Sequence, residues 1–294
     1  MPAKIHARAA HATNMTEQDV VNSTKGLPAT IESLTKDLID LGVKPGMTLL
    51  VHSSLSSLGW VVGGAQAVLM GLGNVLTESG TLVMPTFTDS NGEPSGWSKP
   101  PVPEPWWQVI RDHMPAYDPD LSPTREMGII SETFRKMPGV LRSSHPELSF
   151  AARGPLSEAI IDNHSLWYSL GEKSPLARIY EHNGWVLLLG VGYGNNTSMH
   201  LAEYRANAPG YHEVKISAAM MVEGRREWVT YKNINYNEDL LVPVGEDFDR
   251  ECPDIRIGKV AQASARLFPQ RAFVDFAIDW LKNRMPDRIK PYKS

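Results

Sequence analysis

The sequence has one cysteine, no long apolar run and little net charge. Cys252 alone excludes an intramolecular disulfide and a CxxC site, which fits the reducing cytoplasm. No stretch reaches the roughly 18 apolar residues of a membrane helix, and residues 1–22 have no apolar segment typical of a secretory signal. The formal net charge of −4 argues against nucleic-acid binding. We therefore expect a cytoplasmic protein without membrane or nucleic-acid partners.

Several well-known site motifs are also missing. The glycines of residues 190–194 do not keep the G-x-G-x-x-G spacing, and the chain has no loop with the Walker lysine, so neither a dinucleotide nor a P-loop nucleotide site is supported. HExxH is absent, and we expect no metal. The lack of G-x-S-x-G argues against an α/β-hydrolase. A serine-type acyl hydrolase remains an alternative, since Ser53 or Ser54 next to a histidine and an acid would form a triad.

The apolar pattern predicts alternating strands and helices. Thr30 is the expected cap of a helix that Gly42 ends. A strand over 48–51, a helix over 65–76 and a strand over 81–84 form a βαβ unit. Glu223-Gly224 is the expected turn of a hairpin. Further helices are expected over residues 125–137, 155–162, 175–181 and 272–283, and the hairpin strands over 212–220 and 226–232.

A histidine and a glutamate follow a predicted strand and glycine turn. Residues 185–189 are apolar, residues 190–194 are rich in glycine, and a helix then begins at Asn196, Thr197 or Ser198. His200 and Glu203 lie three residues apart, so both project from one face of this helix. The pattern indicates a general base with an orienting carboxylate, although a surface pair that only supports the helix fits the spacing too.

A second polar loop follows the strand over residues 48–51. It begins at His52 and continues through serines to Gly59. A strand, a hydroxyl-rich loop and a helix in this order are suited to bind a polar or anionic group through backbone N–H donors. A serine-rich loop without a ligand has the same composition.

These stretches together resemble the aminoglycoside 3-N-acetyltransferases, the antibiotic N-acetyltransferase family that is unrelated in fold to GCN5-type enzymes. The resemblance covers residues 28 to 282, and the motifs keep the order of the family. The matching stretches are Val51 to Gly59, Gly80 to Thr86, Arg142 to Pro146, Ser149 to Ala152, Gly171 to Leu176, Leu187 to Gly192 and Asn196 to Glu203. No single stretch is decisive, but their combination is specific.

The resemblance implies transfer of an acetyl group from acetyl-CoA to the 3-amino group of the 2-deoxystreptamine ring of an aminoglycoside, which gives antibiotic resistance. His200 is then the general base, Glu203 its partner, and His52 a third catalytic group, with direct transfer in a ternary complex. The expected cofactor-binding residues are Ser53, Ser54, Leu55, Ser56, Ser57 and Gly59. Another amine metabolite is an alternative acceptor, and a catalytically silent binding protein is a third reading.

A cationic acceptor requires polar and acidic groups in the cleft. The candidates are Asp89, Glu104, Asp118, Asp162 and Asn196. His145 is interpreted as structural, and the role of His164 is left open. We predict an α/β fold: a three-layer sandwich with a central mixed sheet flanked by helices and a small β-hairpin elaboration. Residues 1–26 are expected to be a flexible extension and residues 27–294 a single acetyltransferase domain, as monomer or homodimer.

Overall fold

A central mixed sheet organises the chain in the computed structural model, which describes residues 15–98 and 100–285. Its seven strands run in the order β3-β4-β2-β1-β5-β9-β8. β1 pairs in parallel with both β2 and β5, whereas the outer pairs are antiparallel. The strands are β1 Thr48–Ser53, β2 Thr81–Pro85, β3 Leu141–Arg142, β4 Phe150–Arg153, β5 Trp185–Leu189, β8 Arg256–Val260 and β9 Ala263–Pro269.

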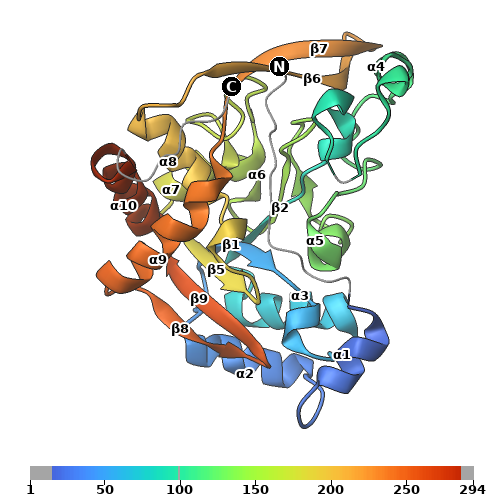
Figure 1. Ribbon diagram of the computed structural model, residues 1–294. Coiled ribbons are helices and arrows are strands. Elements are labelled where there is room, and N and C mark those ends of the chain that lie inside the picture. Colours follow the sequence, from blue (N-terminus) through green and yellow to red (C-terminus); the bar gives the residue numbers. More distant parts are fainter. Residues whose placement is uncertain (1–14, 99, 286–294) are drawn as a thin grey trace.

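Helices cover both faces of this sheet, which gives three layers (Figure 1). One face packs against α2 Ile31–Leu41, α3 Gly64–Leu76 and α5 Gly128–Phe134. The other packs against α6 Ser157–Ile161, α7 Pro175–Glu181, α8 Ser198–Ala206, α9 Leu241–Glu251 and α10 Gln270–Asn283. Two short helices, α1 Glu17–Ser23 and α4 Trp107–His113, complete the fold. The predicted three-layer sandwich is confirmed.

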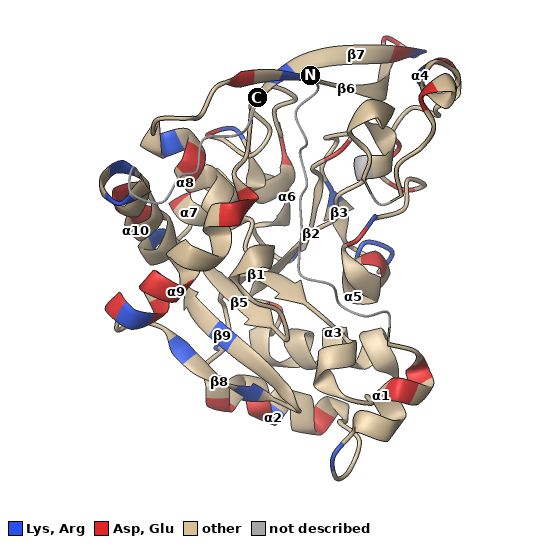
Figure 2. Ribbon diagram, viewed as in Figure 1, with Lys and Arg blue, Asp and Glu red and all other residues tan. Residues whose placement is uncertain are grey.

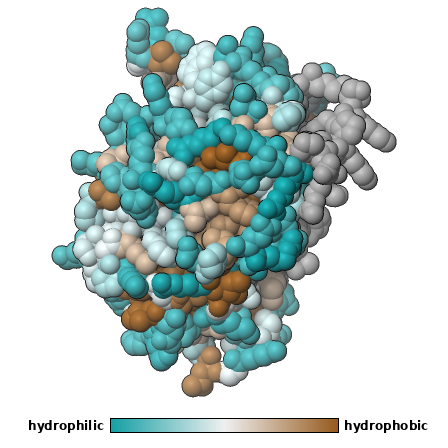
Figure 3. Space-filling view, turned by 90° about the vertical axis from the view of Figure 1, so that its left-hand side faces the viewer, coloured by the Kyte–Doolittle hydropathy of each residue, from teal (hydrophilic) through white to brown (hydrophobic). Residues whose placement is uncertain are grey.

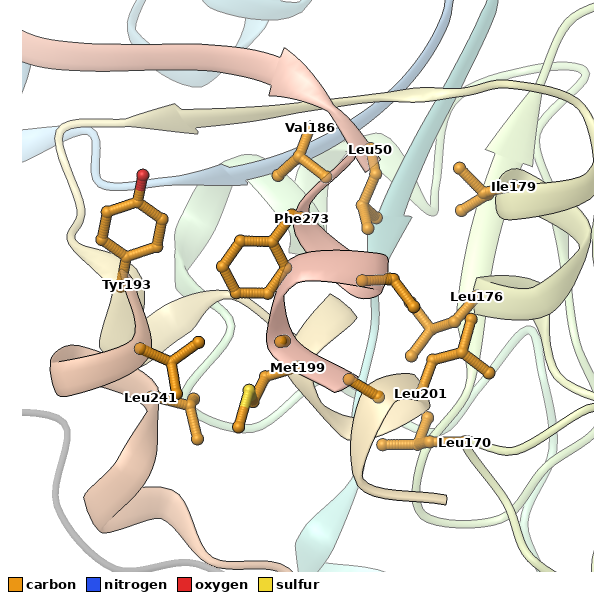
Figure 4. Packing of buried hydrophobic residues seen from close by; sticks show 14 of the residues in the cluster. Leu50, Leu170, Leu176, Ile179, Val186, Tyr193, Met199, Leu201, Leu241 and Phe273 are labelled. Atoms are coloured by element: carbon orange, nitrogen blue, oxygen red, sulfur yellow. The ribbon is translucent and has the colours of Figure 1, made fainter. Parts of the chain in front are cut away.

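Side chains of the central strands alternate between the two cores. In β1, Leu50 joins the cluster with α7, α8 and α10, while Leu49 and Val51 join the opposite cluster. Figure 4 shows Phe273 of α10 amid this first cluster, between Leu50 and Val186 of the strands and the side chains of α8. Because both faces are buried, these strands are continuously apolar rather than alternating.

A long two-stranded ribbon crosses one end of the molecule (Figure 1). It consists of β6 Glu213–Val222 and β7 Arg225–Ile234. Its turn, Glu223-Gly224, has φ values of 48° and 77°, which is the geometry of a two-residue turn that matches the twist of a hairpin. This confirms the predicted hairpin. Asn91 Nδ2 and Tyr117 N both donate to Ala219 O, so the ribbon is fastened to the body at this position of β6.

Several predicted boundaries differ from the structure for local reasons. The helix predicted over 125–137 is only Gly128–Phe134, and it begins later than predicted because Glu126 has a φ of 56°, which a helix interior does not accommodate. Residues 15–26, expected in a flexible extension, include α1, and the Thr24 hydroxyl accepts a hydrogen bond from Trp60 N. Residues 1–14 lie outside the described residues. The domain boundary at residue 27 stays a prediction.

Charged side chains lie mostly on the outer helices and loops, and the strands at the centre are nearly uncharged (Figure 2). On the face in Figure 3, hydrophilic residues cover most of the surface and hydrophobic ones gather in small areas. In the part of the chain that the structure describes, no helix has both the length and the apolar character needed to cross a membrane.

Candidate active site

Two loops meet where β1 and β5 end. The strands are parallel, and His52 and Ser53 pair with Leu188 and Leu189, so the segments that follow both strands begin at the same edge of the sheet. This is the edge at which open α/β sheets keep their ligands. His52 is part of β1, because the strand continues to Ser53, past its predicted end at residue 51.

The two loops are held together by a close contact. Ser57 Oγ donates to Gly190 O at 2.9 Å. Gly190 has φ +71°, and a Cβ there would lie 2.6 Å from the Cβ of Ser57. Only glycine fits this position without displacing the serine loop. The predicted cofactor loop and the turn that leads to α8 are therefore one packed unit.

The start of α8 explains the three candidate capping residues. Asn196 Oδ1 accepts a hydrogen bond from Ser198 N at 3.2 Å, whereas the N-cap residue Thr197 makes no capping side-chain hydrogen bond. Thr197 instead directs its hydroxyl to His52 Nε2 at 3.3 Å. Asn196 is fully buried, and its Nδ2 has no hydrogen-bond partner. Through Thr197, the residue before the helix, α8 is joined to β1.

His200 and Glu203 form a buried hydrogen-bonded pair on α8. His200 Nδ1 lies 2.6 Å from Glu203 Oε2, and the two residues are 6% and 1% exposed. A carboxylate can only accept, so Nδ1 carries the hydrogen and Nε2 of the neutral ring keeps its lone pair. The observed geometry is that of a general base with an orienting acid. The surface-pair alternative is excluded by the burial.

Sequence reasoning missed the residues that hold this pair. Glu203 Oε1 accepts from Tyr211 OH and from Asn237 N, both at 2.8 Å. The ring of Tyr236 lies over His200, with centroids 4.5 Å apart. Tyr211 and Asn237 lie 8 and 34 residues beyond Glu203, so no local spacing pointed to them.

His52 is buried and neutral. Burial, and secondly the charge of His200, lowers the pKa of His52 to about 3. An imidazolium at this position is therefore excluded near neutral pH. What His52 can offer to a ligand is a neutral ring, whose Nε2 contacts Thr197.

The serines of the loop do not form a triad. In the described residues, no hydrogen bond joins Ser53 or Ser54 to a histidine: Ser53 Oγ is buried without a partner, and Ser54 Oγ contacts the hydroxyls of Ser56 and Ser57. Gly59 has φ +78° and faces the side chain of Gln262. Leu55 precedes the 3-10 turn formed by residues 56–58.

The predicted acceptor carboxylates have varied surroundings. Asp118 Oδ1 accepts from Asp120 N and Leu121 N and forms a turn, and Glu104 is exposed at the start of a 3-10 turn. Asp162 lies with Arg142 in the lining of a surface hollow of about 460 Å³. The side chain of Asp89 lies outside the described part. None of the described carboxylates among them has a hydrogen bond or ion pair with His200 or Glu203, and their role stays a prediction.

The two remaining candidate histidines lie in a separate buried cluster. His145 Nδ1 accepts from Leu148 N at 2.9 Å, and His164 Nε2 lies 2.6 Å from Ser169 O. Burial lowers the pKa of His164 to about 4, and burial with the nearby His164 lowers that of His145. Both rings are therefore uncharged near neutral pH, and His145 also contacts the ring of Tyr231. The structural role of His145 stays a prediction, and the role of His164 stays open.

The chain thus combines an α/β fold with a buried, hydrogen-bonded His200–Glu203 pair on the helix that follows the carboxyl end of β5. No group of three or more metal-ligating side chains occurs in residues 15–98 and 100–285. A sequence profile of the aminoglycoside 3-N-acetyltransferases matches residues 50–282. The chain belongs to this family and is an acyltransferase.

Individual relatives agree with this assignment. The aminoglycoside N(3')-acetyltransferase-like protein YokD of Bacillus subtilis is 46% identical over 92% of this chain and 98% of its own length. Aminoglycoside N(3)-acetyltransferase VIII of Streptomyces fradiae is 35% identical over 92% and 98%. The crystal structure of YokD matches with a TM-score of 0.88 at 45% identity, covering 92% of this chain and all of the other.

Two further solved structures carry ligands. AAC-IIIb in a binary complex with CoASH is 28% identical, with a TM-score of 0.78 over 88% of this chain and 98% of the other. AAC-VIa bound to sisomicin is 28% identical, with a TM-score of 0.79 over 88% and 99%.

Proposed function

We propose that this enzyme transfers the acetyl group of acetyl-CoA to the 3-amino group of the 2-deoxystreptamine ring of an aminoglycoside and thereby gives resistance. The observation that carries the proposal is the buried His200–Glu203 pair, 2.6 Å apart, in a chain of this family. Relatives that bind CoASH and sisomicin support the choice of co-substrate and acceptor. The absence of a membrane-spanning helix among the described residues is compatible with the expected cytoplasmic location.

His200 activates the acceptor amine. An aminoglycoside amine is mostly ammonium at neutral pH, and only the free amine attacks a thioester. The ammonium first loses one proton to solvent, and the lone pair of His200 Nε2 then takes a second proton from the attacking nitrogen as the C–N bond forms. Glu203 holds the Nδ1–H and stabilises the resulting imidazolium. The C–S bond then breaks, CoA leaves as the thiolate, and the proton passes from Nε2 to the sulfur or to solvent.

The loop from Ser53 to Gly59 binds the CoA arm. Its packing against Gly190, through the Ser57 hydroxyl, supports this role because the loop is held beside the turn that leads to the base. The thioester oxygen gains negative charge during attack, and backbone N–H donors of this loop stabilise it. His52 contributes as a neutral donor rather than as a cation, since its pKa is lowered to about 3.

Direct transfer in a ternary complex is favoured over a covalent acyl-enzyme. A serine nucleophile requires a base within about 3 Å of its oxygen, whereas the Ser53 hydroxyl has no partner and that of Ser54 contacts only serines. The identity of the acceptor has less support than the type of reaction, and another amine metabolite is the alternative acceptor.

An acceptor panel tests the proposal. CoA release is measured with aminoglycosides that carry or lack the 3-amino group, and the site of acetylation is read by NMR. We expect turnover only with the 3-amino compounds and an amide at that nitrogen. Acetylation of another nitrogen, or equal turnover without the 3-amino group, would overturn the assigned position.

A further inference from the structure

The His200–Glu203 pair on α8 is held by residues at the ends of the ribbon. Tyr211 lies two residues before β6 begins, and Asn237 three residues after β7 ends. Both donate to the same oxygen, Glu203 Oε1. The other oxygen, Oε2, binds His200. Each oxygen of the buried carboxylate thus has its own donors, which fixes the plane of the carboxylate and the direction of the histidine ring.

The side chain of Asn235 links the two ends of the ribbon by hydrogen bonds. Asn235 Oδ1 accepts from His212 N at 2.7 Å, and Asn235 Nδ2 donates to Gly210 O at 3.2 Å. These bonds hold the segment that carries Tyr211 beside the segment that carries Asn237. The two donors to Glu203 therefore belong to segments that are hydrogen-bonded to each other.

The histidine is oriented from the same side. The ring of Tyr236 contacts that of His200 at a tilt of 47°, and its hydroxyl binds Asn233 Oδ1 at 3.0 Å and Tyr204 OH at 2.9 Å. The titratable side chains around the pair are Tyr204 on α8, Tyr211 and Tyr236 at the ribbon, and His52 on β1.

We propose that Tyr211 is a positioning residue of the acetyl transfer: its hydroxyl, donated to Glu203 Oε1, sets the orientation and charge of the carboxylate that holds His200. The inference rests on the proposed role of His200 as base. In this role Tyr211 acts through Glu203 and not on the reacting atoms. It acts by sharing the negative charge of Glu203 and by keeping Oε2 aimed at Nδ1.

Removal of the hydroxyl has two separable effects. In Tyr211→Phe the carboxylate loses an oriented donor, so kcat falls by about 10-fold or more, while KM for acceptor and acetyl-CoA stays within about 2-fold. Glu203, with one donor fewer, attracts the imidazolium more strongly. The acidic limb of the kcat/KM profile therefore moves to higher pH.

Tyr168→Phe is the matched control. Tyr168 OH donates to Glu213 Oε2 at 2.7 Å, so this change removes the same kind of bond at the same end of the ribbon without touching Glu203. We expect Tyr168→Phe to keep the wild-type kcat and an unchanged acidic limb of the kcat/KM profile. An equal loss in both variants would mean that only ribbon stability matters and would overturn the inference.

A second variant covers the case in which Tyr211→Phe folds poorly, which thermal melting would reveal. A ring-fluorinated tyrosine at position 211 keeps the hydroxyl and makes it a stronger donor, so the acidic limb should move to lower pH. Wild-type kcat and an unmoved limb in both Tyr211 variants would refute the role. His200→Gln, measured alongside, separates the failures: if it retains activity, the proposed base is wrong, whereas if it is inactive only the role of Tyr211 is in question.

Discussion

His200 Nδ1 and Glu203 Oε2 lie 2.6 Å apart across one turn of α8, and both side chains are buried. A buried carboxylate beside a neutral imidazole is costly unless its oxygens are hydrogen-bonded. Glu203 meets this condition through Tyr211 and Asn237. The pair is thus a supported site rather than a surface contact, and the predictions below test its consequences.

Glu203→Gln should reduce kcat by on the order of 100-fold or more, because an amide no longer stabilises the imidazolium or fixes its tautomer. Steady-state kinetics at saturating acetyl-CoA measures the loss. Glu172→Gln is the control, because Glu172 forms an ion pair with Arg205 of α8 and its side chain is 61% exposed. Comparable losses in the two variants would show that α8 is merely destabilised.

The double variant Ser53→Ala, Ser54→Ala should lose less than about 10-fold in kcat, because the proposed direct transfer uses neither hydroxyl as a nucleophile. Rapid-quench mass spectrometry of wild-type enzyme with acetyl-CoA alone should find no adduct. A stoichiometric gain of about 42 Da on the peptide of residues 53–57 would establish covalent catalysis instead.

Gly59→Ala should destabilise the fold by more than about 1 kcal/mol and raise the KM for acetyl-CoA. Gly59 has φ +78°, and its Cβ would lie 1.9 Å from Gln262 Nε2. Gly73→Ala serves as control, because nothing lies within 4 Å of its Cβ in α3. Urea unfolding and cofactor titration measure both effects. An unchanged affinity for CoA in a folded Gly59 variant would reject this loop as the cofactor site.

Acid should destabilise the protein through its buried histidines. The folded state keeps the pKa of His164 at about 4, below its ordinary value of 6.5. Between these two pH values the unfolded chain binds more protons, so stability is retained above pH 6.5 and lost as pH falls toward 4, by up to about 1.4 kcal/mol per pH unit for each such group.

Urea unfolding at several pH values measures this slope. His164→Gln should reduce it, whereas His182→Gln, at an exposed position, should leave it unchanged. Equal slopes in wild type and His164→Gln would contradict the assignment of a buried neutral ring.

Local features were predictable from the sequence. Thr30 caps α2 by accepting from Ser33 N, and Gly42 ends this helix with φ +105°, as residue types alone indicated. The spacing of His200 and Glu203 also sufficed to pair them, because three residues on a helix always share a face.

Features set by distant contacts were not predictable. The donors to Glu203 come from the ends of a ribbon whose placement depends on bonds to residues such as Asn91 and Tyr117. α1 is an exception: it was missed although its start carries a local signal, the capping box of Thr16 and Asp19. Composition likewise gave no means to choose among surface carboxylates, since what distinguishes them is their position relative to the site.

The turnover of His200→Ala tests the central claim most directly. With acetyl-CoA and an aminoglycoside that bears the 3-amino group, kcat should fall by at least about 100-fold, because a general base acts only in the transition state. Calorimetry should find CoA affinity nearly unchanged, and His182→Ala should match wild type. If His200→Ala keeps more than about a tenth of wild-type turnover, His200 is not the base and the account is wrong.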